Sequence, residues 1–500
     1  MPTRQINQKV AVSAVFVAAM FMNIMDVTII NVALPTIGRQ FNVRADSVDT
    51  VAIGYLVSLA VFIPASGWLG DRFGSRRVLL TSIVIFTGAS ALCGAAGSLG
   101  ELVAFRVLQG VGGGLMVPVG MAMLFRTFPP AERVRASGIL VIPTAMAPAL
   151  GPVLGGLLVT DVSWRWVFYV NVPIGVAALT FGLVFLAGPV EHRPGPFDLA
   201  GFALAAVGLA LLMYGVSEGP FDGWGSAQIV TTITAGAVLL IALVVFELRA
   251  SYPIIDVRLF SDRLFRSANV VLALGAAAFI GVLFLVALFF QDGLGLSALQ
   301  SGLNTFPEAL GVMAGSQMVT RYLYPNFGPR RVMFGGLILL ACSLSLLALF
   351  GAHTDLWWIR VVMFVCGYAM AHVFVPSQAA AFATISPEAT GRASTLFNAQ
   401  RQLGSAVGVA VVSTVVATVG PVRVVAGRVL PHLTAYHVAF LVAAGLALLG
   451  AVAALTVDDA DAAGTMVPRH ARARSDGGEV AGGEVALPAG STPEPLPAGS

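Results

Sequence analysis

Long apolar stretches separated by short polar segments dominate the chain from about residue 10 to residue 456. A helix that crosses a bilayer needs roughly 20 mostly apolar residues, and each stretch is about that long. The first carries an acidic residue and exceeds the length of a signal peptide's apolar region, so we interpret it as a membrane helix. The pattern predicts fourteen spans, at 10–34, 48–67, 78–98, 101–124, 136–159, 164–187, 198–217, 226–247, 267–290, 299–320, 332–351, 355–380, 392–418 and 433–456.

The composition agrees with this pattern. Hydrophobic residues make up 57% of the 500 residues and charged residues 11%, against about 25% in soluble proteins. The net charge of +3 is small and spread out, which argues against nucleic-acid binding. Cys93, Cys342 and Cys366 lie in separate apolar runs, so we expect no disulfide, no metal site and no cofactor.

Arginines set the expected orientation. If the N-terminus is cytoplasmic, most Lys and Arg residues between spans fall on the cytoplasmic side, as the positive-inside rule requires. An even number of spans then places both termini in the cytoplasm. We expect a multi-pass protein of a bacterial inner (plasma) membrane, acting as a monomer in contact with lipid.

Two short motifs recur at nearly the same offset. Gly74-Ser-Arg-Arg-Val78 returns as Gly328-Pro-Arg-Arg-Val332, and Arg135-Ala-Ser137 returns as Arg392-Ala-Ser394. The repeat predicts two parallel six-helix halves with two spans inserted between them. The expected fold is an all-α membrane protein with residues 1–187 as the N-terminal bundle, 188–266 as a linker with two extra helices, 267–457 as the C-terminal bundle and 458–500 as a disordered cytoplasmic tail.

The segment after the second span is rich in glycine and charge, and reads Gly67-Trp-Leu-Gly-Asp-Arg-Phe-Gly-Ser-Arg-Arg77. We expect a tight turn in which an acid and three arginines form a cluster at the membrane face. The segment resembles the signature loop of the major facilitator superfamily, and this resemblance implies a conformational-switch role for Gly67, Asp71, Arg72, Gly74 and Arg76. A positive turn without a switching role is the alternative. In the second copy Pro325 and Asn326 replace the acid and the base.

Two charged residues lie deep within apolar spans. Asp26 is in span one and Arg106 in span four, and each charge costs about 2.5–3.5 kcal/mol at a bilayer centre. We therefore expect them to pair and to line a water-accessible path between the bundles, where Asp26 could load and release a proton. A purely structural pair is the alternative. Asn23, Asn31 and Gln109 are candidates for the same polar cavity.

Other polar residues occur in the second half. Glu308 follows a proline in span ten, and Asn398 and Arg401 lie in span thirteen. We expect all three to face the substrate cavity, although Glu308 could instead be an interfacial acid. His372 fits a hydrogen-bonded packing residue better than a titrating one.

Span five carries small residues and prolines at the spacing of one helix face. Gly151, Pro152, Gly155 and Gly156 would form a flat face on a bent helix. This resembles the motif that marks antiporters of the major facilitator superfamily, with Ala147 in place of one glycine. The segment that begins at Gly67 resembles the signature loop of the same superfamily.

The chain as a whole, over about residues 10–456, resembles the fourteen-span drug/proton antiporters, of the quaternary-ammonium and multidrug efflux type. Further matching segments are 26–35, 164–173, which includes Asn171, 256–260 and 402–404. The resemblance implies export of amphipathic drugs or natural products in exchange for protons, with Asp26 as the membrane acid and Arg106 as the arginine of span four. Some relatives export cations with an acid in span thirteen. This chain has Arg401 there, which disfavours dications.

Two other functions remain open. Proton-linked uptake or facilitated diffusion of a small nutrient would use the same fold, because fold alone does not set function. An enzyme or sensor is a poorer interpretation, since no nucleotide loop, metal spacing or nucleophile–base pair is evident.

Overall fold

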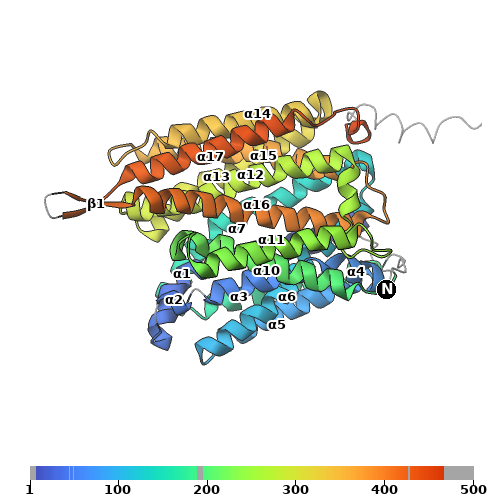
Figure 1. Cartoon of the computed structure of the whole chain (residues 1–500), viewed down its shortest axis with the longest axis horizontal. Coiled ribbons are helices and arrows are strands. Elements are labelled where there is room, and N and C mark those ends of the chain that lie inside the picture. The colour runs from blue at the N-terminus through green and yellow to red at the C-terminus, as the bar shows by residue number, and fades with distance from the viewer. Residues whose placement is uncertain (1–6, 44, 49, 189–194, 426–427, 467–500) are drawn as a thin grey trace, which may run out of the picture. The chain divides into compact units, whose positions relative to one another are not determined.

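The computed structural model describes residues 7–43, 45–48, 50–188, 195–425 and 428–466, and these are almost entirely helical (Figure 1). The α-helices are α1 Gln8–Phe41, α2 Ala45–Val48, α3 Thr50–Phe62, α4 Ala65–Phe73, α5 Ser75–Ala95, α6 Leu99–Thr127, α7 Arg133–Leu157, α8 Trp166–Tyr169, α9 Asn171–Phe185, α10 Leu199–Asp222, α11 Ala227–Glu247, α12 Arg263–Leu288, α13 Ala298–Met318, α14 Tyr324–Leu347, α15 Leu356–Ala381, α16 Thr390–Val419 and α17 Leu433–Ala454. Short 3-10 or π turns are η1 Pro130–Glu132, η2 Leu158–Val162, η3 Val257–Ser261, η4 Phe289–Gly293, η5 Val319–Leu323 and η6 Ala463–Thr465.

The described helices supply the fourteen expected spans. Twelve continuous stretches are long and apolar enough to cross a membrane, and α3 with α4, bent by 57°, forms a thirteenth. One of the twelve, Leu299–Leu347, has 49 residues, or about 70 Å of helix, which is more than twice a hydrocarbon core. It turns at Gly328, where φ is 77°, so it counts as two spans and completes the fourteen.

The spans form two groups of six with two helices between them. In the first group α1 packs against α6, α7 and α9, while α5 packs against α6 and α9. In the second group α12 packs against α15, α16 and α17, and α13 packs against α15. We call these groups the N-bundle (α1 to α9) and the C-bundle (α12 to α17).

The inserted helices have different surroundings. α10 packs against α3 of the N-bundle and α16 of the C-bundle, and Figure 1 shows α10 and α11 in green beside α16. The indole of Trp224, just after α10, donates to the Thr414 hydroxyl of α16 at 2.9 Å. α11 packs chiefly on α10, and only 17% of the residues in its most apolar stretch are buried. α11 therefore presents most of its surface to the surrounding medium, which is lipid for a span of this composition.

Glycines allow the closest helix contacts. A Cβ on Gly311 of α13 would overlap the Phe364 carbonyl, and one on Gly367 of α15 would overlap the backbone of Glu308. Small residues at such crossings let two backbones approach in a membrane, where apolar burial alone does not favour association. The α13–α15 crossing is built in this way.

Two features differ from the expectations. The chain is ordered beyond residue 458: the Arg263 guanidinium pairs with Asp458 at 2.8 Å and Asp461 at 3.0 Å, and the Tyr324 and Thr465 hydroxyls lie 2.7 Å apart. Folded structure thus continues to Met466, because acids in this segment find basic partners at the start of α12; residues 467–500 lie outside the described part. The chain also forms an unexpected hairpin of β1 (Val422–Val425) and β2 (Arg428–Pro431) before α17.

Candidate functional site

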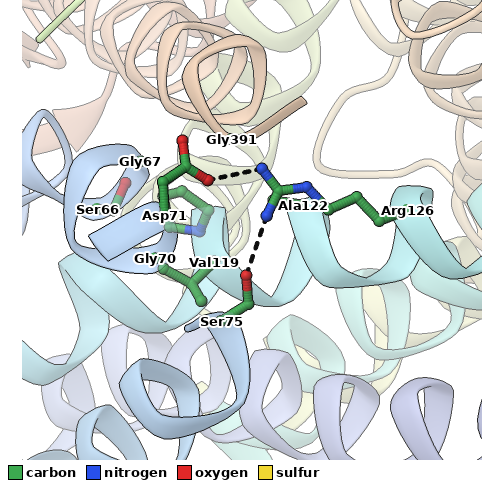
Figure 2. A pocket seen from close by; sticks show the side chains of 10 residues that line it. Ser66, Gly67, Gly70, Asp71, Ser75, Val119, Ala122, Arg126 and Gly391 are labelled. Carbon is green, nitrogen blue, oxygen red and sulfur yellow. Dashed lines mark hydrogen bonds and ion pairs between the residues drawn. The ribbon is translucent and has the colours of Figure 1, made fainter. Parts of the chain in front are cut away.

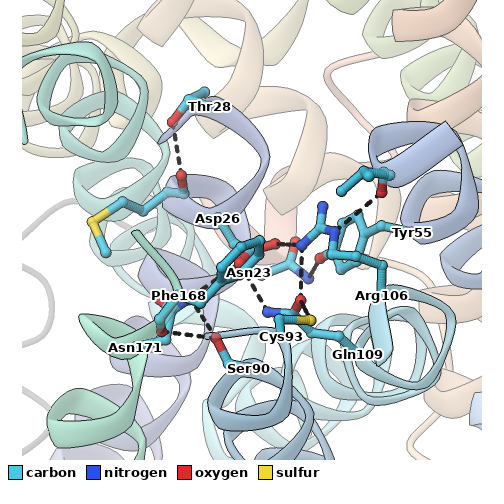
Figure 3. Close-up of polar contacts among 12 residues, drawn as sticks. Asn23, Asp26, Thr28, Tyr55, Ser90, Cys93, Arg106, Gln109, Phe168 and Asn171 are labelled. Carbon is cyan, nitrogen blue, oxygen red and sulfur yellow. Dashed lines mark hydrogen bonds and ion pairs between the residues drawn. The ribbon is translucent and has the colours of Figure 1, made fainter. Parts of the chain in front are cut away.

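A buried ion pair joins α1 and α6 in the N-bundle. The Arg106 guanidinium donates to the Asp26 carboxylate, and each side chain is only 1% exposed (Figure 3). Gln109, one helical turn after Arg106, bonds to both: its carbonyl accepts from Arg106 at 2.8 Å and its amide donates to Asp26 at 2.8 Å. The pairing predicted from the sequence is thus present, with Gln109 as a third member.

Further groups complete the surroundings of this pair. The Asn171 amide of α9 donates to Asp26 at 3.1 Å and to the Ser90 hydroxyl of α5 at 3.2 Å. The Arg106 Nε donates to the Val51 carbonyl of α3 at 3.2 Å, and its guanidinium lies 4.2 Å from the centre of the Tyr55 ring. We call Asp26, Arg106, Gln109, Asn171, Ser90 and Tyr55 the charge network.

Asn171 and Ser90 were not identified as partners of Asp26 from the sequence. Asn171 is a polar residue near the start of the otherwise apolar sixth span, 164–187, which was the available signal. A serine in a membrane helix is too common to single out. Ser90 of α5 and Asn171 of α9 come together because α5 and α9 pack against each other, and this packing cannot be obtained from the sequence.

The charge network is buried and lies inside one bundle. Every described hydrogen-bond and ring partner of Asp26 and Arg106 belongs to the N-bundle. We had expected the pair to line a water-accessible path between the bundles. In this conformation the protein itself provides the opposite charge and the hydrogen bonds, so water is not needed to tolerate the two charges.

The other cavity candidates separate into different places. Asn23 donates to the Tyr55 hydroxyl at 2.8 Å, beside the charge network, whereas Asn31 of α1 is exposed. Glu308 of α13 is 1% exposed and has no hydrogen-bond or ionic partner among the described residues. Asn398 of α16 is buried and donates to the Ser394 carbonyl at 2.9 Å and toward the Met121 sulfur of α6 at 3.4 Å. Arg401 lies one turn further along α16.

His372 of α15 behaves as a packing residue. Its ring Nδ1 lies 2.7 Å from the Tyr368 carbonyl, and the side chain is 7% exposed. No group of three or more His, Cys, Asp or Glu within the described ranges could hold a metal ion.

The glycine-rich segment after span two is mostly helix, not the turn that we expected. Gly67, Asp71 and Arg72 lie within α4, and only Gly74, with φ of 85°, makes the turn into α5. Successive residues of a helix point about 100° apart, so Arg72 cannot join Asp71 and is exposed instead. Arg76 donates to the Leu183 carbonyl at 2.8 Å.

The partner of Asp71 is Arg126, at the end of α6. The carboxylate and guanidinium are 2.7 Å apart, and Arg126 also donates to the Ser75 hydroxyl at 3.2 Å (Figure 2). The Arg126 Nε reaches the Pro387 carbonyl of the C-bundle at 3.1 Å. One arginine thus connects α4, α5 and α6 to the loop before α16.

The two bundles touch closely beside this ion pair. The Ser66 and Thr395 hydroxyls are 3.0 Å apart, and a Cβ on Gly67 would lie 2.9 Å from the Thr395 hydroxyl. Nearby, the rings of Phe125 of α6 and Phe382, which follows α15, stack at 4.4 Å. We call the contact of Ser66, Gly67, Asp71 and Arg126 with Pro387, Gly391 and Thr395 the α4–α16 junction.

The small residues of α7 face α1, one turn after Asp26. A Cβ on Gly151 would overlap Thr28, and one on Gly155 would lie 3.1 Å from Ile29. Gly156 faces open space, and the side chain of Pro152 is not among those that the structure describes. The α1–α7 contact therefore depends on Gly151 and Gly155.

Two parallel bundles, a buried charge network and an α4–α16 junction define a multi-pass membrane transporter. The family model of the Major Facilitator Superfamily matches residues 16–409 and again 309–477. The chain belongs to this superfamily, whose members are transporters rather than enzymes.

Its relatives belong to the drug-efflux branch of that superfamily. The chain is 33% identical over 411 residues to the multidrug resistance protein B homolog of Mycobacterium tuberculosis, covering 80% of this chain and 75% of that protein. It is 33% identical over 464 residues to the tetracenomycin C resistance and export protein of Streptomyces glaucescens, covering 90% and 83%. The crystal structure of the human organic anion transporter MFSD10 (TETRAN) matches with a TM-score of 0.59 and 18% identity, covering 91% and 100%, which shows a shared fold.

Proposed function

We propose that this transporter is a proton-coupled antiporter that exports amphipathic drugs or natural products by alternating access. The observation that carries the proposal is the buried carboxylate of Asp26, held by Arg106, Gln109 and Asn171. Relatives named for multidrug resistance and for tetracenomycin C export support the direction of transport. The expected partners are protons, lipid and a small amphipathic substrate.

Protonation of Asp26 would change the charge network as a unit. A neutral carboxyl no longer compensates Arg106, and breaking a buried pair costs about 3–5 kcal/mol. Because the pair is buried in this conformation, proton exchange requires a second conformation in which water reaches Asp26. The α1–α7 contact at Gly151 and Gly155 is the place where a movement of α1 would be felt first.

The available driving force matches this scale. A proton gradient gives about 1.4 kcal/mol per pH unit, and the membrane potential about 2.3 kcal/mol per charge per 100 mV. One proton that moves down one pH unit and 100 mV thus releases about 3.7 kcal/mol. That is comparable with the cost of opening the pair.

In this scheme the α4–α16 junction is the conformational switch. Asp71, Arg126 and the Pro387 carbonyl connect the bundles at one end, so release of Arg126 would let α16 separate from α4. We place this end in the cytoplasm, together with both termini, because the arginine distribution favours that orientation. The conformation described would then be closed toward the cytoplasm.

The test is proton-dependent efflux in everted membrane vesicles. We expect Asp26→Asn to abolish substrate movement driven by an imposed pH gradient, while Asp222→Asn, at an exposed carboxylate at the end of α10, leaves it unchanged. Intact pH-driven transport by Asp26→Asn would contradict the role given to Asp26.

Uptake or facilitated diffusion of a nutrient is the second candidate. The tight glycine packing of α7 on α1 resembles an antiporter feature and counts against it. Expressing cells that accumulate a substrate, instead of losing it, would decide for uptake.

A further inference from the structure

Arg401 is an arginine near the middle of a membrane span. It is the twelfth residue of α16, so it lies about 17 Å along the helix from its first residue. The side chain is partly exposed, like its neighbours on α16 from Ala399 to Ala406, whereas the preceding turns from Ala393 to Asn398 are buried. A guanidinium at this depth costs about 2.5–3.5 kcal/mol unless something compensates it.

The described structure offers no such compensation. Arg401 has no side-chain hydrogen bond, ion pair or ring contact within the ranges that the structure describes. The helices that pack against α16 are α4, α6, α10, α12 and α17. Neither α16 itself nor α12 or α17 contains an Asp or Glu.

The acids of the remaining neighbours lie at helix ends and away from Arg401. Asp71 of α4 already pairs with Arg126, and Glu101 lies in the first turn of α6. Glu218 and Asp222 lie in the last turns of α10. The level of Arg401 on α6 is marked by Met121, which contacts Asn398, and this part of α6 is free of acids.

Unfilled hydrogen-bond acceptors lie next to this free cation. The side-chain carbonyl oxygens of Asn398 and Gln400 are buried and have no donor. Asn398 precedes Arg401 by one turn and therefore shares its side of the helix. The contact of Asn398 with Met121 of α6 places this face of α16 against the N-bundle.

We infer that Arg401 and Asn398, one turn apart on α16, form a binding site for the acid group of an amphipathic organic anion. The guanidinium would donate two parallel hydrogen bonds to a carboxylate or sulfonate, which is the geometry it provides best. The free side-chain oxygen of Asn398 would accept a hydrogen bond from a hydroxyl or amide N–H of the same molecule. The apolar body of the ligand would lie against α6 and α12. This deepens the proposed function, and its role in export rests on that function.

The charges also exclude other ligands. Arg106 is satisfied inside the charge network, which leaves Arg401 as the uncompensated cation in the middle of the described spans that contact α16. A permanently cationic ligand would add repulsion to a charge that already lacks a partner. An anion supplies the missing partner, so binding and charge compensation occur together.

The test uses one apolar body with three head groups. Pyrene with a butanoate chain, the corresponding neutral butanamide and the corresponding butyl-trimethylammonium cation are titrated onto the purified full-length protein in nanodiscs, with energy transfer from tryptophan as the readout. We expect the butanoate to bind at least tenfold more tightly than the butanamide, and the cation most weakly. Equal affinity for butanoate and butanamide, preference for the cation, or binding of none of the three overturns the inference.

Variants then assign the effect to the residue. Arg401→Gln is expected to remove the preference for butanoate, and Arg401→Lys to retain part of it. Arg423→Gln, which removes the same charge from the exposed hairpin, is the matched control and should change nothing. A preference that survives in Arg401→Gln overturns the assignment. If that variant does not fold, the comparison of Arg401→Lys with the native protein still decides, since lysine lacks the planar fork.

The two hypotheses fail in different ways. Loss of pH-driven efflux with intact butanoate preference would refute the antiport mechanism and leave this site standing. If pH-driven efflux is intact but the protein shows no preference among the head groups, the anion site is refuted and the antiport mechanism stands.

Discussion

Arg106 and Arg401 each place a guanidinium inside a membrane helix, one in the N-bundle and one in the C-bundle. Around Arg106 the protein assembles a carboxylate, an amide, a backbone carbonyl and an aromatic ring. Around Arg401 the described residues offer no acid and no hydrogen bond. The guanidinium is thus bonded to other residues of the protein in the N-bundle and has no described partner in the C-bundle.

The difference indicates a division of labour between the bundles. In the proposed antiport mechanism, the self-contained charge network is the part that exchanges the proton. A lone cation can be satisfied only by something that arrives from outside. We therefore expect the N-bundle to determine the coupling to protons and the C-bundle to determine the charge of the substrate.

The largest effect should come from breaking the compensated pair. Arg106→Gln leaves the Asp26 carboxylate buried without its cation, which costs about 3–5 kcal/mol of stability. Thermal unfolding in detergent should show a marked fall in Tm. The double variant Asp26→Asn with Arg106→Gln should recover a large part of that loss, and failure to recover would mean that the pair is not the main determinant.

Removal of the uncompensated charge should act in the opposite direction. Arg401→Gln replaces an unpaired cation by a neutral amide, so we expect stability to stay level or to rise by up to about 3 kcal/mol. The same thermal unfolding measurement checks this. A fall in Tm as large as that of Arg106→Gln would show that Arg401 has a partner. The contrast between a compensated Arg106 and an uncompensated Arg401 would then be wrong.

A smaller effect is expected at the α4–α16 junction, where the ion pair is partly exposed. Arg126→Gln removes the bonds to Asp71 and Pro387, and we expect a shift of about 1 kcal/mol toward the separated state, or about fivefold in population. Thiol labelling of Ser66→Cys, in a Cys342→Ser background, reports the opening, since Ser66 is fully buried here. Arg72→Gln, at an exposed neighbour, is the control and should leave labelling unchanged.

The smallest effect concerns the corresponding turns of the two halves. The first half supplies its acid, Asp71, from within its own motif, whereas the second half has Pro325 at the corresponding position. Asp459, from the segment after α17, accepts a hydrogen bond from the Arg330 amide at 2.8 Å, beside the turn at Gly328. Asp459→Asn should cost about 0.5–1.5 kcal/mol locally.

Hydrogen exchange of residues 456–466 measures this last effect. Faster exchange confined to that segment is the expected result. Exchange that does not change would mean that Asp459 does not hold the segment in place.

The residues alone were enough to predict the span count, the duplicated halves and the Asp26–Arg106 pairing. Membrane insertion depends on about 20 consecutive apolar residues, which is a local property, and a charge within such a run must find a partner. With one carboxylate in the first span and one guanidinium in the fourth, that partner could be identified without coordinates.

The tertiary structure alone decided which residues surround those charges. Asp71 pairs with Arg126 and not with Arg72. The reason is that Asp71 and Arg72 are successive residues of α4, so their side chains point in different directions. Asn171 joined the charge network, and Asp459 reached the second turn, because of packing between segments far apart in the chain. Rotation of a helix about its axis and the path of a loop depend on all neighbours together, so they cannot be obtained from a one-dimensional pattern of polar and apolar residues.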